Sequence, residues 1–539
     1  MSKQFIFMAV IFFALIFSAS ITFAANVGQG KKILYIPIDN RPCNLKQTAE
    51  VAEKLGYEII TPPENFLGTG ATPEKLGNPD ELWNWLENNA AGVDAAVIST
   101  DAMIYGSLVG SRLHDLSAEK IMERAKKFED FNKKFPYIPI YAFGTIMRTP
   151  TAAGSSFEPE YYQTYGAMIW NYTRLKDKSE VEKLSRSEQK NFAKFESEIP
   201  AEFLSDWLGR RQKNYDANEY FINLASEGIF QYFLLGCDDN APFSQTHLES
   251  RHLTEHAKNL NLGKTVCLVT SGADELGILM ISRAVNKNLN QIPFVAVSYN
   301  EGKGKNTIPT YCNEIIGQSV SDAIIAAGGL EIPAPERADL VLAINTNFNG
   351  KTFEASSSKN KIKPRRETKT FMKLLNNFLE KNYPVGIVDI ATANGSDNAL
   401  MNQLKEKNLQ FKISAYGGWN TATNSSGFFI GAGVLTKFMN DYEKNSLLLT
   451  RYFDDWIYQA NIRTQLTNGL IWTVPGEGNY SNLNEKREGL EKLTAELAEK
   501  FAAENILLPQ KTSLKNIRAK FPWDRCFEAD ISFDFDSTR

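Results

Sequence analysis

Two adjacent carboxylates, Asp238 and Asp239, are the residues of this sequence best suited to acid–base chemistry, and they follow the apolar run Tyr232–Cys237. If both side chains enter one pocket, repulsion and burial raise one pKa, which leaves a proton donor beside an ionised partner. Glycosidases need such a pair. A helix cap beside a buried, hydrogen-bonded aspartate is the alternative. We assign Asp238 and Asp239 as candidate catalytic residues, with Asp239 as general acid and Asp238 as orienting carboxylate.

Polar residues also follow most other apolar runs of the chain. In parallel α/β proteins the ligand binds outside the carboxyl ends of the strands, so these residues are candidates for substrate binding. Capping the next helix is the alternative for any single one, and their accumulation at many strand ends favours a site. The candidate substrate-binding residues are Asp39, Asn40, Arg41, Asp101, Tyr105, Arg112, Arg148, Asp274, Glu275, Asn394, Trp419 and Asn420.

The segment Tyr416–Thr421 combines two glycines, a tryptophan and an asparagine. Glycine allows a ligand to approach the backbone closely. Trp419 offers a flat stacking face, and Asn420 supplies both a hydrogen-bond donor and an acceptor. Such groups hold sugar rings, although a buried turn would explain the same residues. We expect Trp419 and Asn420 to hold the ring of a sugar.

A metal site is a further alternative, because His252 and His256 lie one helical turn apart. The chain has no H-E-x-x-H motif, and histidines on a polar helix are usually exposed. A hard cation held by carboxylates needs no histidine and stays open. We expect no cofactor. The residues of this alternative are Asp238, Asp239, His247, Glu249, His252, Glu255 and His256.

Composition narrows the classes of function further. The 539 residues include 59 Lys and Arg against 63 Asp and Glu, so the basic excess of a nucleic-acid-binding protein is absent. Only 4 His and 5 Cys are present, and the cysteines show no paired spacing, which favours buried thiols over a disulfide framework. No Walker loop, dinucleotide fingerprint or nucleophile elbow is found.

The elements that must position these residues are short β-branched runs that alternate with helical stretches. Most runs are continuously apolar, as strands covered on both faces are. This pattern predicts an α/β protein with a mainly parallel sheet. We favour a (β/α)8-barrel-like fold with extra strands, and two α/β lobes are the alternative. The predicted strands are 33–38, 95–99, 138–143, 232–237, 266–270, 294–298, 340–344, 385–390 and 411–415, with a short one at 58–60.

The chain divides into four predicted regions. Residues 1–24 form a signal peptide. Residues 25–290 form an N-terminal α/β part with a helical insertion at 155–228, which lacks a strand pattern and is rich in Tyr, Trp, Lys and Glu. Residues 291–434 form a second α/β part. Residues 435–539 form a helical C-terminal region, in which Leu490, Leu493 and Leu497 share one helix face.

The N-terminus predicts export. Lys3 precedes the apolar run Phe5–Phe17, and small residues end at Ala24, where we expect cleavage. The apolar run is shorter than the roughly 20 residues that a spanning helix needs, so we expect no stable membrane insertion after cleavage. The protein is therefore predicted to be secreted or periplasmic.

A set of short segments spread along the chain forms a specific combination, although each segment alone is weak. The segments are Ile36–Pro42, Ser99–Asp101, Tyr105–Gly106, Ser111–Arg112, Gly236–Asp239, Gly272–Glu275, Asp389, Asn394–Gly395, Tyr416–Thr421, Arg451, Asp454–Trp456 and Phe521–Trp523. Together they resemble an uncharacterised bacterial family catalogued as domain of unknown function 4127. The resemblance extends from about residue 32 to about residue 530, and it implies membership without an activity.

The sequence leads to one functional hypothesis and two alternatives. We expect an exported carbohydrate-active hydrolase, a glycosidase, whose partner is a carbohydrate or a cell-wall-derived ligand. A non-catalytic receptor for a sugar or cell-wall fragment is the first alternative, and two lobes would favour it. A metal-dependent hydrolase built on the same carboxylates is the second.

Overall fold

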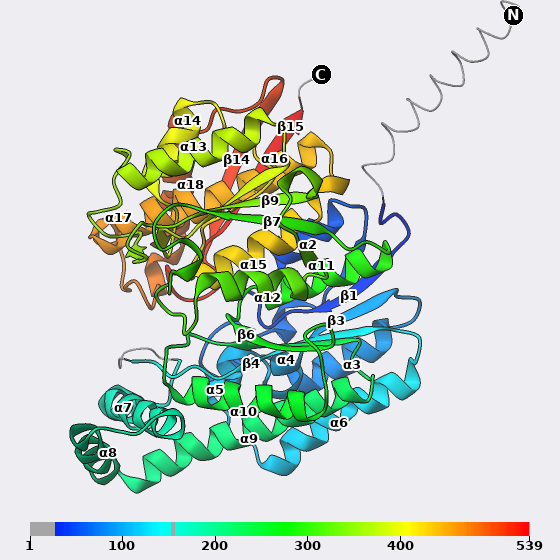
Figure 1. Ribbon diagram of the computed structural model, residues 1–539, viewed down its shortest axis with the longest axis vertical. Coiled ribbons are helices and arrows are strands. Elements are labelled where there is room, and N and C mark those ends of the chain that lie inside the picture. Colours follow the sequence, from blue (N-terminus) through cyan, green and yellow to red (C-terminus); the bar gives the residue numbers. More distant parts are fainter. Residues whose placement is uncertain (1–26, 152–156, 538–539) are drawn as a thin grey trace, which may run out of the picture.

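The structure of the protein is a computed structural model that describes residues 27–151 and 157–537 (Figure 1). The predicted signal peptide, residues 1–24, lies outside the described residues. Within them, helices alternate with parallel strands in two large sheets, so the prediction of a mainly parallel α/β fold is confirmed.

The first sheet has six parallel strands in the order β2-β1-β3-β4-β5-β6. Its strands coincide closely with the predicted apolar runs, and every residue of β3 is buried, as strands covered on both faces require. The strands are β1 (Lys32–Ile36), β2 (Glu58–Ile60), β3 (Ala95–Ser99), β4 (Ile140–Ile146), β5 (Tyr232–Cys237) and β6 (Cys267–Ser271).

The second sheet has five parallel strands in the order β13-β11-β9-β7-β8. When its strands are numbered in chain order and the sheet is read from β8, the order is 2-1-3-4-5, the same as that of the first five strands of the first sheet. The strands are β7 (Phe294–Tyr299), β8 (Leu330–Glu331), β9 (Leu340–Asn345), β11 (Val385–Asp389) and β13 (Tyr416–Gly417).

Both sheets are open, and no strand pairing joins them among the described residues. A closed (β/α)8 barrel, which we favoured, is therefore not shown, and the arrangement has the form of the two-lobe alternative. The first lobe contains β1–β6 and the second β7–β13. Strand patterns do not reveal which strands pair, so the sequence left open whether β6 and β7, which flank the predicted boundary at residues 290/291, belong to one barrel or to separate sheets.

Helices α2 (Lys46–Glu53), α11 (Leu276–Asn288), α12 (Ile316–Ala326) and α15 (Ala422–Gly433) lie between the two sheets (Figure 1). One hydrophobic core extends from the first sheet through these helices to the second. Ile281 on α11 and Phe429 on α15 are both almost completely buried in it. The lobes thus share a continuous core.

The helices on the outer sides of the sheets follow the strands as crossover connections. Those of the first lobe are α3 (Pro79–Asn89), α4 (Thr100–Tyr105), α5 (Leu108–Leu113), α6 (Ala118–Lys134) and α10 (Gln245–Asn259). Those of the second are α13 (Arg366–Glu380) and α14 (Asn398–Glu406), beside a small sheet of β10 (Phe353–Glu354) and β12 (Thr392–Ala393).

The region predicted as a helical insertion contains α7 (Tyr162–Val181), α8 (Arg186–Glu198) and α9 (Ala201–Ser226). Figure 1 shows α7 and α8 projecting from the first lobe. They pack on α9 through a small cluster of their own, which includes Tyr162, Ile169 and Trp207.

The C-terminal region is helical for most of its length and ends in an antiparallel hairpin that we did not predict. Its helices are α16 (Asp441–Arg451), the π-helix η6 (Tyr452–Ile462), α17 (Arg463–Thr467) and α18 (Arg487–Asn505), and the hairpin strands are β14 (Thr512–Lys520) and β15 (Asp530–Ser537). The predicted strand 411–415 is also misplaced, because these residues form turns and the strand begins at Tyr416.

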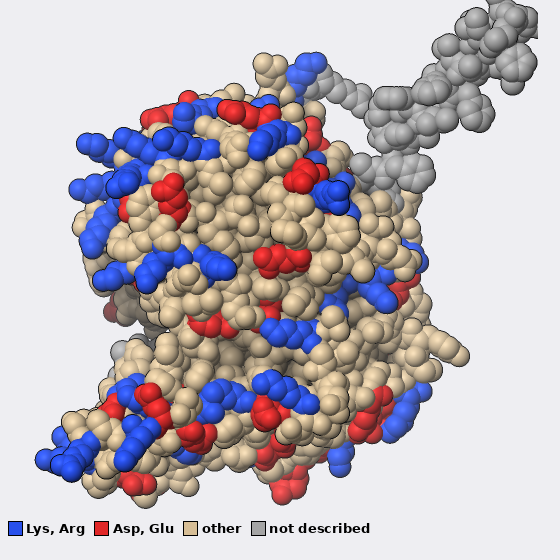
Figure 2. Space-filling model, in the orientation of Figure 1, with Lys and Arg blue, Asp and Glu red and all other residues tan. Residues whose placement is uncertain are grey.

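All five cysteines are free and buried, as their spacing suggested. Burial raises the pKa of the Cys267 thiol to about 12. Among the described residues, no helix combines the length and the apolar character needed to cross a membrane. Figure 2 shows acidic and basic side chains interspersed over one face of the molecule.

Candidate functional site

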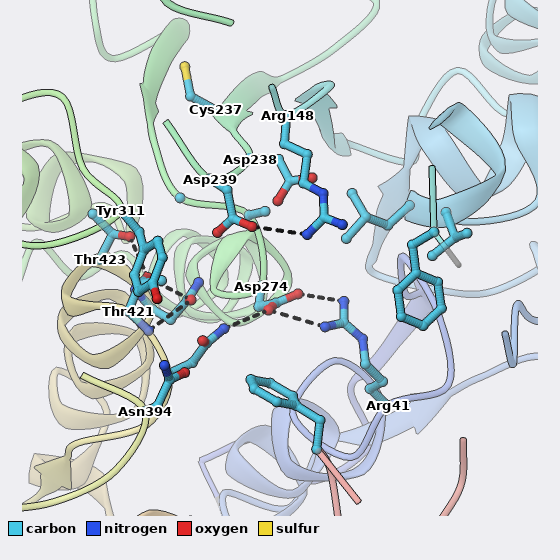
Figure 3. A pocket seen from close by; sticks show the side chains of 18 of the residues that line it. Arg41, Arg148, Cys237, Asp238, Asp239, Asp274, Tyr311, Asn394, Thr421 and Thr423 are labelled. Carbon is cyan, nitrogen blue, oxygen red and sulfur yellow. Dashed lines mark hydrogen bonds and ion pairs between the residues drawn. The ribbon is translucent and has the colours of Figure 1, made fainter. Parts of the chain in front are cut away.

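A cavity of about 250 Å³ lies between residues that follow strands of both sheets (Figure 3). The first lobe contributes Arg41, Leu108, Val109, Arg112, Arg148, Cys237, Asp238, Asp239, Gly272, Ala273 and Asp274. The second lobe contributes Tyr311, Asn394, Asn420, Thr421, Thr423 and Asn424. Phe157, Trp523, Arg525 and Phe527 complete the wall. We call this cavity the central pocket.

The central pocket lies at the place where the first sheet reverses its strand order. Arg41 follows β1, and Arg112 lies on α5, after β3. The other strands of this sheet continue from β3, whereas β2 lies beyond β1. Open α/β sheets bind their ligands at such a switch point, outside the carboxyl ends of the strands.

Asp238 and Asp239 enter the pocket with different surroundings. Asp238 is buried and forms an ion pair with the Arg112 guanidinium. Asp239 has 39% of its side chain exposed, and Arg148 Nη1 donates to its Oδ2 at 3.1 Å (Figure 3). Desolvation and the neighbouring Asp238 raise the pKa of Asp239, although Arg148 opposes the shift. The pair therefore combines a buried carboxylate with an accessible one that holds its proton more tightly than usual.

Arg148 is fixed by a second carboxylate. Its Nε donates to Glu158 Oε1 at 2.7 Å, so the guanidinium joins Glu158 to Asp239. Burial would lower the pKa of Arg148, but the nearby carboxylates of Glu158 and Asp239 outweigh it and raise this pKa above its ordinary value. This side chain thus stays charged while it holds the Asp239 carboxyl group in the pocket.

Asp274 connects the two lobes across the pocket. Its Oδ1 accepts from Arg41 Nη2 at 2.5 Å, and its Oδ2 accepts from Asn420 Nδ2 at 3.4 Å (Figure 3). Arg41 Nη2 also donates to Asp39 Oδ2 at 2.8 Å. Burial raises the pKa of Asp274, and Arg41 opposes this shift. The floor of the pocket is therefore a buried network of paired charges.

The second lobe supplies an exposed aromatic ring and two amides. Tyr311 is 44% exposed, and its hydroxyl donates to Glu354 Oε1 at 3.2 Å. Asn394 Nδ2 donates to Glu354 Oε2 at 2.8 Å. The φ angles of Tyr311 (66°), Asn394 (58°), Asn420 (51°) and Asp239 (34°) are all positive. A bulky residue rarely adopts this conformation, and such strain is typical of functional sites.

Eight of the fourteen predicted site residues line the central pocket: Arg41, Arg112, Arg148, Asp238, Asp239, Asp274, Asn394 and Asn420. The other six lie behind its wall. Asp39 is completely buried beneath Arg41, and Asn40 accepts a hydrogen bond from Trp523 Nε1 at 2.8 Å. These two residues hold pocket-lining side chains in place.

Asp101, Tyr105 and Glu275 are also buried behind the pocket. Asp101 accepts from the Thr145 backbone at 2.7 Å, and burial raises its pKa to about 7. Tyr105 stacks on His114. Glu275 accepts from Asn424 Nδ2 at 2.6 Å, and burial raises its pKa to about 8.

The expectation that Trp419 would stack on a ligand does not agree with the structure. Its side chain is only 2% exposed and belongs to the core that the lobes share. Large aromatic side chains are as well suited to a core as to a sugar site, and sequence alone does not separate the two. Tyr311 is the aromatic residue with an exposed ring at this pocket.

Several lining residues are absent from the predicted site residues, although Thr421 lies in the segment Tyr416–Thr421 noted above. Among them are Tyr311, Thr421, Thr423, Asn424, Trp523, Arg525 and Phe527. The last three follow β14, in a region where no parallel strand marked a carboxyl end. Of these three, Trp523 belongs to the segments that carry the family resemblance. Its position beside Arg41, 5.4 Å from the guanidinium carbon to the ring centre, comes from the packing of the C-terminal region on the first lobe.

The histidines considered for a metal site lie on α10, away from the central pocket. His247 pairs with Asp177 at 2.6 Å, and His252 pairs with Glu180 at 2.8 Å. In residues 27–151 and 157–537 no group of three or more His, Cys, Asp or Glu side chains is arranged to hold a metal ion. The pocket carboxylates Asp238, Asp239 and Asp274 each pair with an arginine instead.

Comparison with known proteins identifies one family. A model of the family described as "Protein of unknown function (DUF4127)" matches residues 33–532, which is nearly the whole chain. No curated protein and no solved structure matches the chain.

Proposed function

Since the chain belongs to the DUF4127 family, whose description states no function, we propose a function from the central pocket itself: the protein is a carbohydrate-active hydrolase, a glycosidase. The observation that carries this proposal is the position of Asp239. It is an accessible carboxyl group with a raised pKa, placed beside the buried carboxylate of Asp238. Two carboxyl groups in unlike surroundings divide the roles of acid and ionised partner.

In the proposed reaction Asp239 donates its proton to the glycosidic oxygen as the bond from this oxygen to the sugar carbon breaks. A water molecule then supplies hydroxide to that carbon and returns a proton to Asp239. Asp238, kept in place by Arg112, orients a polar group of the sugar next to the reacting carbon. Arg148 holds the acid in position.

The remaining lining supports a sugar as the ligand. Tyr311 presents an exposed ring, Asn394 and Asn420 present amides, and Thr421 and Thr423 present hydroxyl groups. Aromatic faces combined with fixed donors and acceptors bind polar rings selectively. We further propose that the protein acts outside the cytoplasm, because residues 1–24 have the composition of a signal peptide.

The proposal is tested by screening the purified protein against aryl glycosides and cell-wall glycans, with product release as the measurement. Asp239→Asn should lower turnover at least about 100-fold, because general acid catalysis contributes roughly 10²–10⁴-fold. Binding of the same glycan should persist in this variant. Asp441→Asn, at a side chain that is 96% exposed, is the matched control and should retain full activity. Unchanged turnover in Asp239→Asn would exclude the acid role.

A non-catalytic sugar receptor is the second candidate, and the two-lobe arrangement favours it. Residues from both lobes line one pocket, as in binding proteins that close on a ligand. The core that passes through α11 and α15 weighs against a hinge between the lobes. A glycan would raise the melting temperature of a receptor without forming any product. Since a receptor has no turnover, the Asp239→Asn substitution could not lower it.

A further inference from the structure

A second cavity, of about 300 Å³, lies directly beside the central pocket. Phe157, Trp523 and Arg525 line both cavities, so these three side chains form a shared wall. Lys75, Ser481 and Asn482 line the second cavity from its other sides. We call it the side pocket.

The shared wall is firmly held. The Arg525 guanidinium carbon lies 4.5 Å from the ring centre of Phe157 and 4.9 Å from that of Trp523. Its Nε donates to Glu528 Oε2 at 2.7 Å. Trp523 is buried and donates to Asn40 in the first lobe. A ligand that leaves the central pocket over this wall would meet stacked rings and a guanidinium group, surfaces that suit a sugar ring.

The charge of the side pocket differs from that of the central pocket. Among the described residues that line it, the one carboxylate is that of Asp524, which pairs with Arg487 at 2.8 Å. Lys75 is partly buried, and in the described part of the chain no carboxylate pairs with it. In the central pocket, by contrast, each aspartate has an arginine partner. Lys75 therefore adds to this lining a positive charge without an ion-pair partner in residues 27–151 and 157–537, and its chain neighbour Glu74 interacts with it only through space.

Size also indicates that the two cavities act together. Small-molecule sites usually measure roughly 300–1,000 Å³, and the central pocket alone lies below this range. Together with the side pocket it lies well inside the range. We propose that the side pocket is a second subsite, so that the ligand is a chain of at least two sugar units, and that Lys75 selects a carboxylate on the unit bound there. This inference rests on the carbohydrate ligand of the proposed function.

The test measures binding in the full-length Asp239→Asn protein, so that a glycan is not consumed. An array of neutral and carboxylated oligosaccharides of one to six units selects the probes, and calorimetry then gives their dissociation constants. Ser481→Trp fills the side pocket from an exposed position, and Lys75→Ala removes its charge. The matched controls are Ser197→Trp and Lys126→Ala, both exposed and remote from the pocket.

We expect chains of two or more units to bind about tenfold or more tightly than single units. Ser481→Trp should remove this gain without changing single-unit binding, and Lys75→Ala should weaken only the carboxylated chains. Equal binding of all lengths, untouched by Ser481→Trp, would overturn the second subsite and leave the proposed function standing. Equal losses for neutral and carboxylated chains in Lys75→Ala would overturn the charge selection. Failure of every glycan to bind would overturn the proposed function together with this inference.

Discussion

Asp238 and Asp239 are neighbours in the chain, yet the structure gives them different chemistry. The strand β5 ends at Cys237, after which Asp238 is buried and Asp239 has a positive φ. The Asp238 side chain therefore turns to Arg112, and the Asp239 side chain opens into the pocket. Sequence showed that two carboxylates stood at a strand end. It did not show which one would be accessible, because that depends on arginines 90 and more residues away in the chain.

The Arg112–Asp238 pair should be important for stability as well as for ligand binding. Arg112→Met leaves a buried carboxylate without its partner, which typically costs about 3–5 kcal/mol. Urea denaturation should show this loss, and the double variant Arg112→Met/Asp238→Asn should recover part of it. Lys126→Met, at an exposed position, is the control and should change stability by less than about 0.5 kcal/mol. An equal loss in the single and double variants would contradict the account.

Glu275 predicts a pH dependence of stability. Burial raises its pKa in the folded protein to about 8, against roughly 4.3 in an unfolded chain. The folded state therefore binds this proton more tightly. The stabilisation from Glu275 is fully present below about pH 4.3 and is lost as the pH rises to about 8. The limiting slope is about 1.4 kcal/mol per pH unit.

Glu275→Gln keeps the shape of the side chain and removes the titration. We expect the unfolding free energy of the wild type to fall more steeply between pH 4.5 and 8 than that of the variant. Urea denaturation across this range measures both profiles. Parallel profiles would mean that Glu275 does not take up a proton on folding.

At the scale of elements, the sequence predicted strands well where they are long and buried. The apolar runs that became β3 and β5 have the predicted limits, because continuous burial on both faces requires a continuous apolar run. The two-residue strands β8, β10 and β12 were missed, since two residues carry no pattern. The hairpin strand β15 carries a period of two in Ile531, Phe533 and Phe535, and this alternation is typical of a strand with one buried face.

The candidate site was predictable only in part, because strand ends are visible in the sequence and the paths of loops are not. Residues that follow parallel strands could be listed from the sequence, and eight of these line the pocket. Tyr311 and Arg525 come from loops whose paths depend on tertiary packing. No local pattern places such loops.

Because β5 and β6 approach each other closely, we expect a side chain introduced at Gly236 to destabilise the protein. A Cβ atom there would lie 2.2 Å from the Gly272 carbonyl oxygen and 2.8 Å from a Leu276 methyl group. Gly236→Ala should therefore destabilise the protein by roughly 1–3 kcal/mol, as overpacking does. Turnover should fall too, because β5 leads into Asp238. Gly209→Ala on α9, where nothing lies within 4 Å, should stabilise by about 1 kcal/mol. Thermal denaturation compares the two, and similar melting temperatures would refute the packing argument.

At the scale of the whole molecule, the two lobes are joined more closely than lobes connected by a hinge. The α11–α15 contact is apolar and continuous with the interiors of both sheets. The C-terminal region also contacts both lobes, since Arg451 donates to Gln47 of α2 at 2.6 Å and η6 packs on the second sheet's side. Each open sheet must cover both of its faces, and the helices between the two sheets cover one face of each.

This shared core predicts that the lobes unfold together. Calorimetry should show one transition whose calorimetric and van't Hoff enthalpies agree. Ile281→Ala, in α11, should lower the temperature of that single transition, because such a truncation costs about 2–5 kcal/mol. Two separate transitions, with only one shifted by Ile281→Ala, would show that the lobes are independent.

The five buried thiols carry a practical consequence. Cys43, Cys237 and Cys267 lie in the first lobe, Cys312 in the second and Cys526 near the C-terminus, and all are unpaired. A thiol that is buried and protonated reacts with an alkylating reagent only after its surroundings open. The alkylation rate of each thiol in the native protein would therefore report local unfolding around it. Because the thiols are distributed over the molecule, the order in which they are labelled would map which parts open first.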